Sequence, residues 1–366
     1  MSDGIVPPRP GRPSLLAALA AAVRQLPSPR RLLELGPHDG AHRVALRAGV
    51  AVGLPLLALW AVGRMDLALF TTFGAFTSLY GRSHAHVTRA KLQSTVAAAL
   101  VTGVAIGGLV ALSPQRLWLV VPIGAVFAGA VTLLANAYGW RPAGSLFPVF
   151  ALTATASIPT DLPGALLSTG LAAGAAALAL VIGVSGLVRS SARQLPRGRW
   201  DVDPVRAARQ RGTGQDVGRT VVAVLVAGAI PTALGLDYPY WSMIAAAASI
   251  SGADVAARFV RAGHRLVGTL LGVGIAAVIL ALHPPLLLTV AIVAALQVGA
   301  ELFVVRNYGL ALVFVTPLAL VMIALAHPQD VGGLLWHRLL ETVIGVLVVI
   351  AITLVEHVAV ALRRSV

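Results

Sequence analysis

Long apolar runs separated by short polar gaps occupy most of this chain. A membrane-spanning helix needs about 20 largely apolar residues, and the pattern predicts about 12 such helices. The predicted segments lie at residues 44–63, 66–81, 92–112, 117–137, 145–159, 163–188, 217–236, 239–253, 264–282, 285–304, 308–326 and 332–357. Several are short or rich in small residues, which suits helices inside a bundle. The chain is therefore expected to be an all-α polytopic membrane protein.

The composition supports this interpretation and excludes several others. Of the 366 residues, 57% are hydrophobic and 11% are charged, whereas soluble domains carry about 25% charged residues. Cysteine is absent, which excludes disulfides and thiolate metal sites. Lys91, the only lysine, is followed by Leu92 and so forms no phosphate-binding loop. No histidine spacing indicates a metal site and no nucleophile motif indicates a hydrolase, so neither a cofactor nor enzymatic activity is expected.

The net charge of +14 comes from arginines that gather in alternate gaps between the apolar runs. This distribution is typical of membrane topology and not of nucleic-acid binding. With the N-terminus inside, most basic residues fall on the cytoplasmic side, so both termini are expected there. Residues 1–43 would form a cytoplasmic tail and residues 189–216 an Arg-rich cytoplasmic linker. The basic stretch at 254–263 would be a cytoplasmic gap between two helices.

The membrane part divides into two halves, residues 44–188 and 217–366, that look like copies of each other. Short matches recur in the same order and at nearly constant spacing: Arg47 with Arg219, Arg89-Ala90 with Arg261-Ala262, and Tyr138-Gly139 with Tyr308-Gly309. Each half holds six predicted helices, so both would insert in the same orientation as parallel repeats. The chain is expected to act as a monomeric pseudo-dimer or as a homo-oligomer.

A more specific pattern lies at residues 238–272. A Tyr-Trp pair begins a short helix, a basic stretch follows, and Arg-x-x-Gly-Thr-x-x-Gly comes next; the matching residues are Trp241, Arg258, Arg265, Gly268, Thr269 and Gly272. This pattern resembles the fusaric-acid-resistance (FUSC) family of bacterial inner-membrane proteins, in the aromatic acid exporter superfamily. It covers roughly 217–285, and the first half has Leu69 where Trp241 would align. The resemblance implies export, or passive passage, of organic anions such as aromatic carboxylates across the plasma membrane.

Several polar residues are candidates for the path of such an anion. Arginine stays charged at any working pH and binds carboxylates through two parallel hydrogen bonds. Arg47, Arg219 and Arg265 could form a cationic entrance, although Arg47 and Arg219 could equally anchor helix ends on the cytoplasmic side. The remaining candidates recur in both halves, and they could donate to a carboxylate, cap helix ends or lie at the interface: Asn136, Tyr138, Asn307 and Tyr308.

Two acidic residues within predicted spans are candidates for proton coupling, since a charge there costs about 2.5–3.5 kcal/mol on insertion scales. Glu301 is either solvated near the interface or faces a cavity. Glu341 shares a helical face with His337 and Arg338 and could pair with them. Because Trp336 suggests a nearby interface, Arg338 could reach water, whereas Glu341 lies deeper and is the better proton carrier. Three glycine pairs with GxxxG spacing predict close helix packing: 103 and 107, 170 and 174, and 268 and 272.

Two alternatives remain open at this point. A major-facilitator-type carrier also has two parallel halves of six helices. A non-transporting membrane scaffold could use a basic cytoplasmic face to bind anionic lipid or a partner. A polar cavity lined by Arg47, Arg219 and Glu341 would favour transport, whereas a dry apolar core would favour the scaffold.

Overall fold

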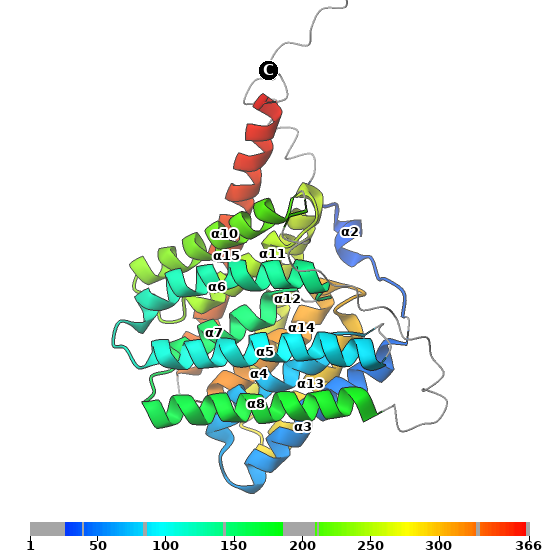
Figure 1. Ribbon diagram of the computed structural model, residues 1–366, viewed down its shortest axis with the longest axis vertical. Coiled ribbons are helices and arrows are strands. Elements are labelled where there is room, and N and C mark those ends of the chain that lie inside the picture. The colour runs from blue at the N-terminus through cyan, green and yellow to red at the C-terminus, as the bar shows by residue number, and fades with distance from the viewer. Residues whose placement is uncertain are drawn as a thin grey trace, which may run out of the picture.

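A computed structural model describes residues 26–38, 40–82, 86–141, 144–185, 209–210, 212–326 and 330–363. Every regular element in these ranges is a helix (Figure 1). The first half contains α2 (Pro29–Leu33), α3 (Ala41–Ala61), α4 (Ala68–Ala75) between the short 3-10 turns Met65–Leu67 and Phe76–Leu79, α5 (His86–Ala111), α6 (Arg116–Tyr138), α7 (Leu146–Ser157) and α8 (Leu162–Val184). The second half contains α10 (Thr213–Ala233), α11 (Tyr240–Ile250), α12 (Val255–Ala281), α13 (Leu286–Phe303), α14 (Tyr308–Ala326) and α15 (Val331–Arg363).

Nine of the described helices are long and apolar enough to cross a membrane. The prediction of an all-α polytopic membrane protein is therefore confirmed. This number is smaller than the predicted 12 spans, because three apolar helices are too short to be counted as spans: Met65–Leu79, Leu146–Ser157 and Tyr240–Ile250. A helix rises 1.5 Å per residue, so the 11 residues of α11 fall well short of a hydrocarbon core about 30 Å thick.

The short helices form the centre of the molecule. Every residue of α4 and of α11 is buried, as small residues within a bundle predict. Aromatic rings connect these helices: Phe150 of α7 lies 5.1 Å from Phe73 of α4 and 5.4 Å from Trp241 of α11, measured between ring centroids. The core is therefore shared by both halves of the chain and does not belong to either half alone.

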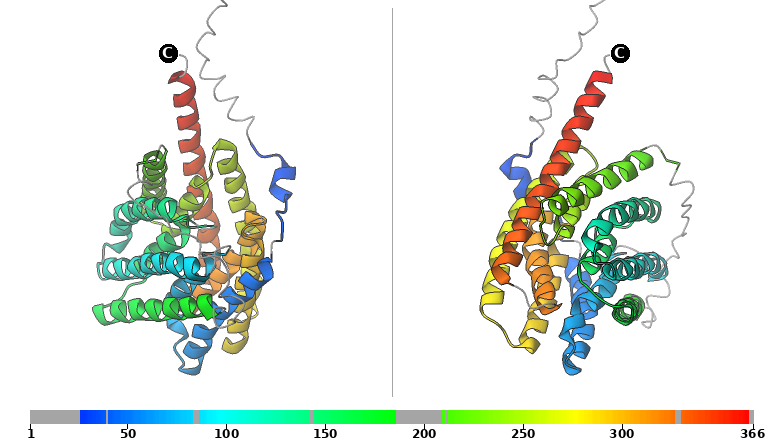
Figure 2. Two further views of the ribbon diagram at one scale, coloured as in Figure 1. Left: turned by 45° about the vertical axis from the view of Figure 1, so that its right-hand side comes forward. Right: turned by 90° about the vertical axis from the view of Figure 1, so that its left-hand side faces the viewer.

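The long helices form two groups around this centre. In Figure 1, α5, α6, α8 and α10 run across the view, whereas Figure 2 shows α12 to α15 running in a different direction. The first long helix of each half belongs to the other half's group, because α3 packs on α13 and α10 packs on α6. The two halves thus exchange their first helices.

Glycines allow the closest helix contacts. On α12, a Cβ atom at Gly268 would overlap the backbone of Gly309 on α14, and one at Gly272 would lie 2.7 Å from Cβ of Thr316. On α5, Gly103 and Gly107 lie equally close to the backbone of α7. Close packing is therefore confirmed for these two pairs. It is wrong for the pair at 170 and 174, which faces outward from α8 with no described atom within 4 Å.

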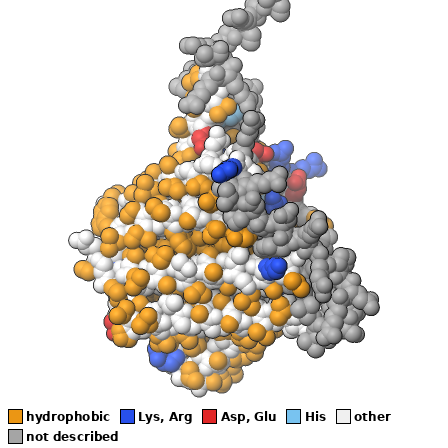
Figure 3. Space-filling model, in the orientation of Figure 1, with side chains coloured by type: hydrophobic (Ala, Val, Ile, Leu, Met, Phe, Trp, Pro, Cys, Tyr) orange, Lys and Arg blue, Asp and Glu red, His pale blue; other side chains and the backbone are white. Residues whose placement is uncertain are grey.

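The outer surface of the long helices is apolar. Figure 3 shows hydrophobic side chains over the face formed by α5, α6 and α8, with charged side chains gathered at its edges. Large exposed side chains on these three helices include Leu109, Val126 and Leu166, which are 59%, 69% and 66% exposed. So much exposed apolar area is compatible with a membrane environment and not with water. These surfaces contact the lipid bilayer.

The basic stretch expected to form a gap at 254–263 is instead the beginning of α12. The Asp254 side chain accepts a hydrogen bond from the Ala257 amide at 2.7 Å and caps the helix. Helical spacing then places Arg258 and Arg265 on the inward face, where both are buried. Of the predicted cytoplasmic segments, residues 1–25 of the tail and 186–208 of the linker region lie outside the described residues.

Candidate functional site

Two arginines are buried in the second half with nitrogen atoms that have no acceptor. Arg265 of α12 is 2% exposed and Arg338 of α15 is 1% exposed. Nη1 of Arg265 donates to the Tyr308 hydroxyl at 3.0 Å, but its Nε has no partner. Nε and Nη1 of Arg338 also lack partners, and the two positive charges lie close enough to repel each other. An unpaired buried charge is costly, so this pair is suited to receive an anion.

Trp241 forms one wall of this site. The guanidinium carbon of Arg338 lies 3.8 Å from the centre of the Trp241 ring, a cation–π contact. The indole Nε1 of Trp241 is buried and has no acceptor. The hydroxyls of Thr269 and Thr316, on the neighbouring helices α12 and α14, are likewise buried without partners. Donors on α11, α12, α14 and α15 are thus left without acceptors, and Thr316 lies beside Gly272, about two turns along α12 from Arg265.

Glu341 is fully buried on α15 beside this group. Its Oε1 accepts a hydrogen bond from the Tyr238 amide at 3.2 Å, while its Oε2 has no partner. The expected pairing with Arg338 does not occur, because Arg338 turns toward Trp241. The expectation that Arg338 reaches water is also wrong. Trp336 is 62% exposed, but two residues along a helix turn the side chain by about 200° onto another face.

A second polar contact leads from Glu341 toward the surface. Nδ1 of His337 lies 3.6 Å from Oε1 of Glu341, and Nε2 lies 3.6 Å from Oδ2 of Asp237. Asp237 helps to line a hollow of about 280 Å³ between the α5–α6 and α10–α11 connections, together with Arg116. Burial, and then the charges of Asp237 and Glu341, raise the pKa of the Tyr238 phenol. Tyr238 therefore remains neutral throughout the working pH range.

Glu301, near the end of α13, belongs to a separate cluster. It is 3% exposed, and Arg82 donates both to its carboxylate and to its backbone oxygen. Arg47 lies near Glu301, Arg82 and Arg89, and its Nε and Nη2 have no acceptor. Glu301 is therefore ion-paired and not solvated, with Arg82 bonded to its carboxylate and Arg47 nearby.

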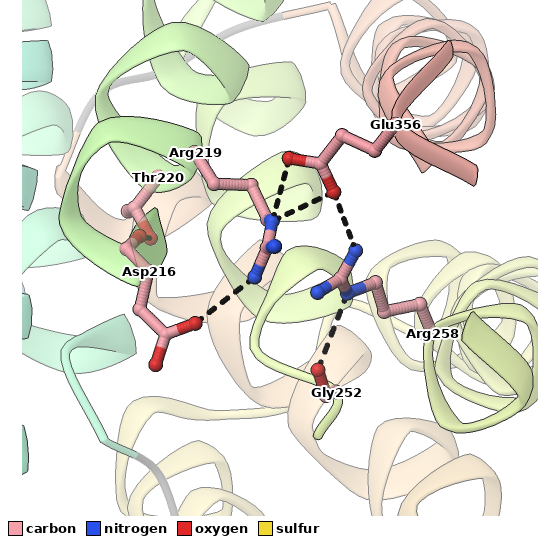
Figure 4. Close-up of polar contacts among 6 residues, drawn as sticks. All are labelled: Asp216, Arg219, Thr220, Gly252, Arg258 and Glu356. Carbon is pink, nitrogen blue, oxygen red and sulfur yellow. Dashed lines mark hydrogen bonds and ion pairs between the residues drawn. The ribbon is translucent and has the colours of Figure 1, made fainter. Parts of the chain in front are cut away.

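Arg219 lies in a third cluster, at the ends of α10, α12 and α15 (Figure 4). Its Nε donates to both carboxylate oxygens of Glu356, at 2.8 and 2.9 Å, and its Nη1 donates to Asp216 at 2.9 Å. Glu356 also accepts from Nη1 of Arg258 at 3.0 Å, and Nε of Arg258 donates to the Gly252 carbonyl. The positive charges are balanced here, so the cluster ties three helices together.

The structure does not bring Arg47, Arg219 and Arg265 to one entrance. Each belongs to a different cluster, because α3 and α10 pack in opposite groups of helices. For the same reason Arg47, Arg219 and Glu341 do not line one cavity. No local sequence signal indicates the partner of Arg219, since Glu356 is 137 residues away.

The two asparagines also differ. Asn307 is buried, and its Nδ2 donates to the carbonyls of Leu32 and Glu34 at 2.9 and 3.0 Å. Its Oδ1 accepts from the Leu310 amide at 2.9 Å and caps α14. Asn136 is exposed on α6. Asn307 is therefore a structural anchor, and the two asparagines do not form a symmetric pair.

The tyrosines differ as well. Tyr308 bonds Arg265 and lies 5.4 Å from the guanidinium carbon of Arg261, whereas Tyr138 packs beside the apolar core. Within the described ranges, no group of three or more His, Asp or Glu side chains could hold a metal ion. His84 lies outside those ranges.

The comparisons with known proteins concern the second half of the chain. Residues 224–352 match the family described as fusaric acid resistance protein-like. The uncharacterized membrane protein YvaC of Bacillus subtilis (strain 168) is 34% identical over 125 residues. That alignment covers 34% of this chain and 20% of the Bacillus protein. No solved structure matches the chain.

The matched range extends from α10 into α15 and contains both buried arginines. It also contains Trp241 and Gly272, which delimit the sequence pattern that predicted the resemblance. Residues 224–352 of this multi-pass membrane protein are therefore similar to the fusaric acid resistance protein-like family, as that pattern predicted.

Proposed function

We propose that the protein transports organic anions, such as aromatic carboxylates, across the membrane along a path that passes Arg265 and Arg338. The observation that carries this proposal is the presence of two buried guanidiniums with unpartnered nitrogens. A protein core rarely keeps buried donors without acceptors unless they serve a ligand. A carboxylate between the two arginines would reduce their repulsion and accept from both.

The surroundings of the arginines favour an anion with an apolar body. The Trp241 ring lies against one face of Arg338, and Tyr240 interacts with Arg338 electrostatically. Ligand sites commonly combine apolar and aromatic walls with a few polar groups that fix orientation.

We further infer an arrangement of 12 helices in two parallel repeats, 44–188 and 217–366, with both termini in the cytoplasm of a bacterial cell. Three observations support it. Long and short helices follow each other in similar order in both halves. The first of the six helices in each half packs on the fourth helix of the other half. These pairs are α3 on α13 and α10 on α6. Paired glycines occupy corresponding positions, on α5 facing α7 and on α12 facing α14.

These relationships support a single chain that acts as its own pseudo-dimer in the inner membrane. The 12-helix count includes the short helices, which would cross only part of the bilayer within the bundle. Irregular or short segments are tolerated at membrane depth where protein surrounds them.

The alternatives receive less support. A scaffold that only binds lipid or a partner at its surface has no use for unpaired arginines in its core, and each would lower its stability. No observation on the described residues favours the major-facilitator-type carrier. The remaining path candidates, Arg47 with Glu301 and Arg219 with Glu356, would act at the cytoplasmic ends of the helices.

The proposal can be tested with purified protein in liposomes. Uptake of labelled benzoate and succinate would be compared with uptake by protein-free vesicles, for the wild type and for Arg265→Gln and Arg338→Gln. Loss of a charged hydrogen bond is worth about 1.5–3 kcal/mol, so we expect KM to rise about tenfold or more. Arg64→Gln is the matched control, because Arg64 is an exposed arginine paired with Asp66.

The wild type and the control variant should transport the anions with the same KM, whereas the two core variants should show the raised KM. Failure of correctly folded wild-type protein to move either anion would overturn the proposal. Unchanged transport by both core variants would overturn the assignment of the site.

A further inference from the structure

Three side chains connect the buried site to the surface at the α10–α11 end of the molecule. We propose that Asp237, His337 and Glu341 form a proton relay, so that protons reach Glu341 from this end and bind together with the anion. This inference rests on the proposed transport function and adds to it a coupling ion, a route and a sequence of proton transfers. It also distinguishes the two candidate acids, because among the residues that the structure describes such a route leads to Glu341 and not to Glu301.

The relay follows from the position of the imidazole. The two nitrogens of His337 face different carboxylates, each 3.6 Å away. This distance exceeds a hydrogen bond by a few tenths of an ångström, so a small rotation or one bridging water would complete each contact. Histidine changes protonation near neutral pH and can take a proton at one nitrogen while releasing one at the other.

Exposure falls along the three residues in the order that a proton path requires. The Asp237 side chain is 74% exposed and lines the 280 Å³ hollow. The His337 side chain is 18% exposed, and that of Glu341 is 0% exposed. Protons from water can therefore reach Asp237 directly, whereas Glu341 depends on the histidine between them.

Each transfer balances within the relay. Protonated Asp237 gives its proton to Nε2 of neutral His337, which leaves an aspartate and an imidazolium. The imidazolium releases the proton on Nδ1 to Glu341, which leaves a neutral histidine and a glutamic acid. The neutral ring then carries its proton on Nε2, and loss of that proton to water with uptake of one from water at Nδ1 restores the first tautomer. Water is the only other participant.

The neighbouring charged groups come from every element packed around the relay. Asp330 precedes α15 and, with Asp237, lies near the Tyr238 ring, which meets His337 edge-on at 5.3 Å. Tyr240 of α11 and Arg338 of α15 interact with Glu341. The neutral phenol of Tyr238 does not compete for the proton.

The link to the anion runs through Arg338, three residues before Glu341 on the same helix. An ionised Glu341 offsets part of the positive potential at Arg338, and its protonation removes that offset. Anion binding should therefore tighten as pH falls, and by reciprocity the bound anion should favour protonation of Glu341. The proton and the anion would then move together. Glu301 has no comparable route, because Arg82 holds its carboxylate.

The test measures proton uptake driven by an anion. Benzenesulfonate is a suitable probe because it stays ionised, so it carries no proton through the lipid by itself. Liposomes that contain the wild-type protein and a pH-sensitive dye should take up protons together with the anion. The KM for the anion should fall about five- to tenfold when the pH is lowered from 8 to 6. Asp237→Asn and His337→Gln should slow proton uptake at least fivefold.

Two further variants complete the experiment. His283→Gln changes an exposed histidine in the α12–α13 connection and should behave as the wild type. Glu341→Gln should remove the pH dependence of the anion KM. Because glutamine is neutral like a protonated Glu341, the KM should equal the low-pH value of the wild type at every pH. Asp237 is a surface residue, so Asp237→Asn keeps the test informative even where a core variant folds poorly.

The outcomes separate the two proposals. Anion transport without proton movement, or with wild-type proton movement in both relay variants, would overturn the relay and leave the transport function intact. Absence of benzenesulfonate, benzoate and succinate transport in folded wild-type protein would overturn the transport function itself.

Discussion

Arg338 and Trp241 are stacked in the core, with 3.8 Å between the guanidinium carbon and the centre of the indole ring. Both side chains are 1% exposed. Stacking occupies one face of the guanidinium but leaves its in-plane N–H groups free, and Nε and Nη1 have no acceptor. The contact thus holds a charged group in position without satisfying its hydrogen bonds, which is the arrangement that a carboxylate-binding site requires.

Two substitutions separate the roles of the Trp241 ring and its N–H. Trp241→Phe keeps an aromatic face for Arg338 but removes the indole donor, so it should weaken anion affinity while changing stability little. Trp241→Leu removes the face as well and should lower the unfolding free energy by about 2–4 kcal/mol through lost cation–π contact and a cavity. Thermal unfolding in detergent and transport KM provide the two measurements. Equal losses of stability in Trp241→Phe and Trp241→Leu would contradict the assignment of the stabilising role to the aromatic face.

The positions of the helices were largely predictable from the sequence, because an apolar run of sufficient length has few alternatives to a helix in lipid. Each predicted segment overlaps a described helical element. The start of α12 was not predicted, because Arg258 and Arg261 interrupt the apolar run, although Arg258 lies on the buried face. Hydropathy does not distinguish a charge that faces water from one that faces a core.

The site was predictable only in part. Arg265 and Glu341 were identified as ionisable residues near or within spans, and that signal is local. The burial of Arg338 was missed because the neighbouring Trp336 indicates a surface. The Glu356 cluster was missed because its partners lie 98 and 137 residues away. In a helix that is apolar on all sides, periodicity does not reveal which face is inside, so such contacts require the three-dimensional structure.

The α12–α14 contact should tolerate no added side chain at Gly272. A Cβ there would lie 2.7 Å from Cβ of Thr316 and 2.9 Å from the Leu312 carbonyl oxygen. Gly272→Ala should therefore lower the unfolding free energy by about 1–3 kcal/mol, measured as a lower midpoint of thermal unfolding. Gly274→Ala is the control two residues away, where no described atom lies within 4 Å. It should be neutral or stabilising, since alanine favours the helix, and equal destabilisation of both variants would contradict the packing.

Glu356 should contribute more to stability than Asp216, although both bond Arg219. Glu356→Gln weakens contacts to two arginines on two helices, whereas Asp216→Asn affects one contact on the same helix. The Glu356 side chain is 35% exposed, so solvent screening limits the expected loss to about 1–2 kcal/mol. The loss for Asp216→Asn should be about 0.5 kcal/mol or less. Thermal unfolding at low and high salt checks both values, and a larger effect of Asp216→Asn would contradict the bridging role of Glu356.

Asn307 should hold the segment at residues 32–36 against the beginning of α14. Its Nδ2 donates to two carbonyls of that segment, while its Oδ1 caps the helix. Asn307→Asp keeps the capping oxygen but removes both donors, so hydrogen exchange should accelerate in residues 32–36 and not in α14. Asn307→Ala should accelerate exchange in both, because losing an N-cap costs about 0.5–2 kcal/mol.

The control for this prediction is Asn136→Ala, which changes an exposed asparagine on α6. It should leave exchange in both regions unchanged, because Asn136 does not contact the segment that Asn307 holds. The amide of Gly36 is the most direct probe, since it donates to the Arg306 carbonyl at 2.8 Å beside Asn307. Slow exchange at Gly36 in both Asn307 variants would show that Arg306 and His264, which also bond this segment, suffice to hold it without the asparagine.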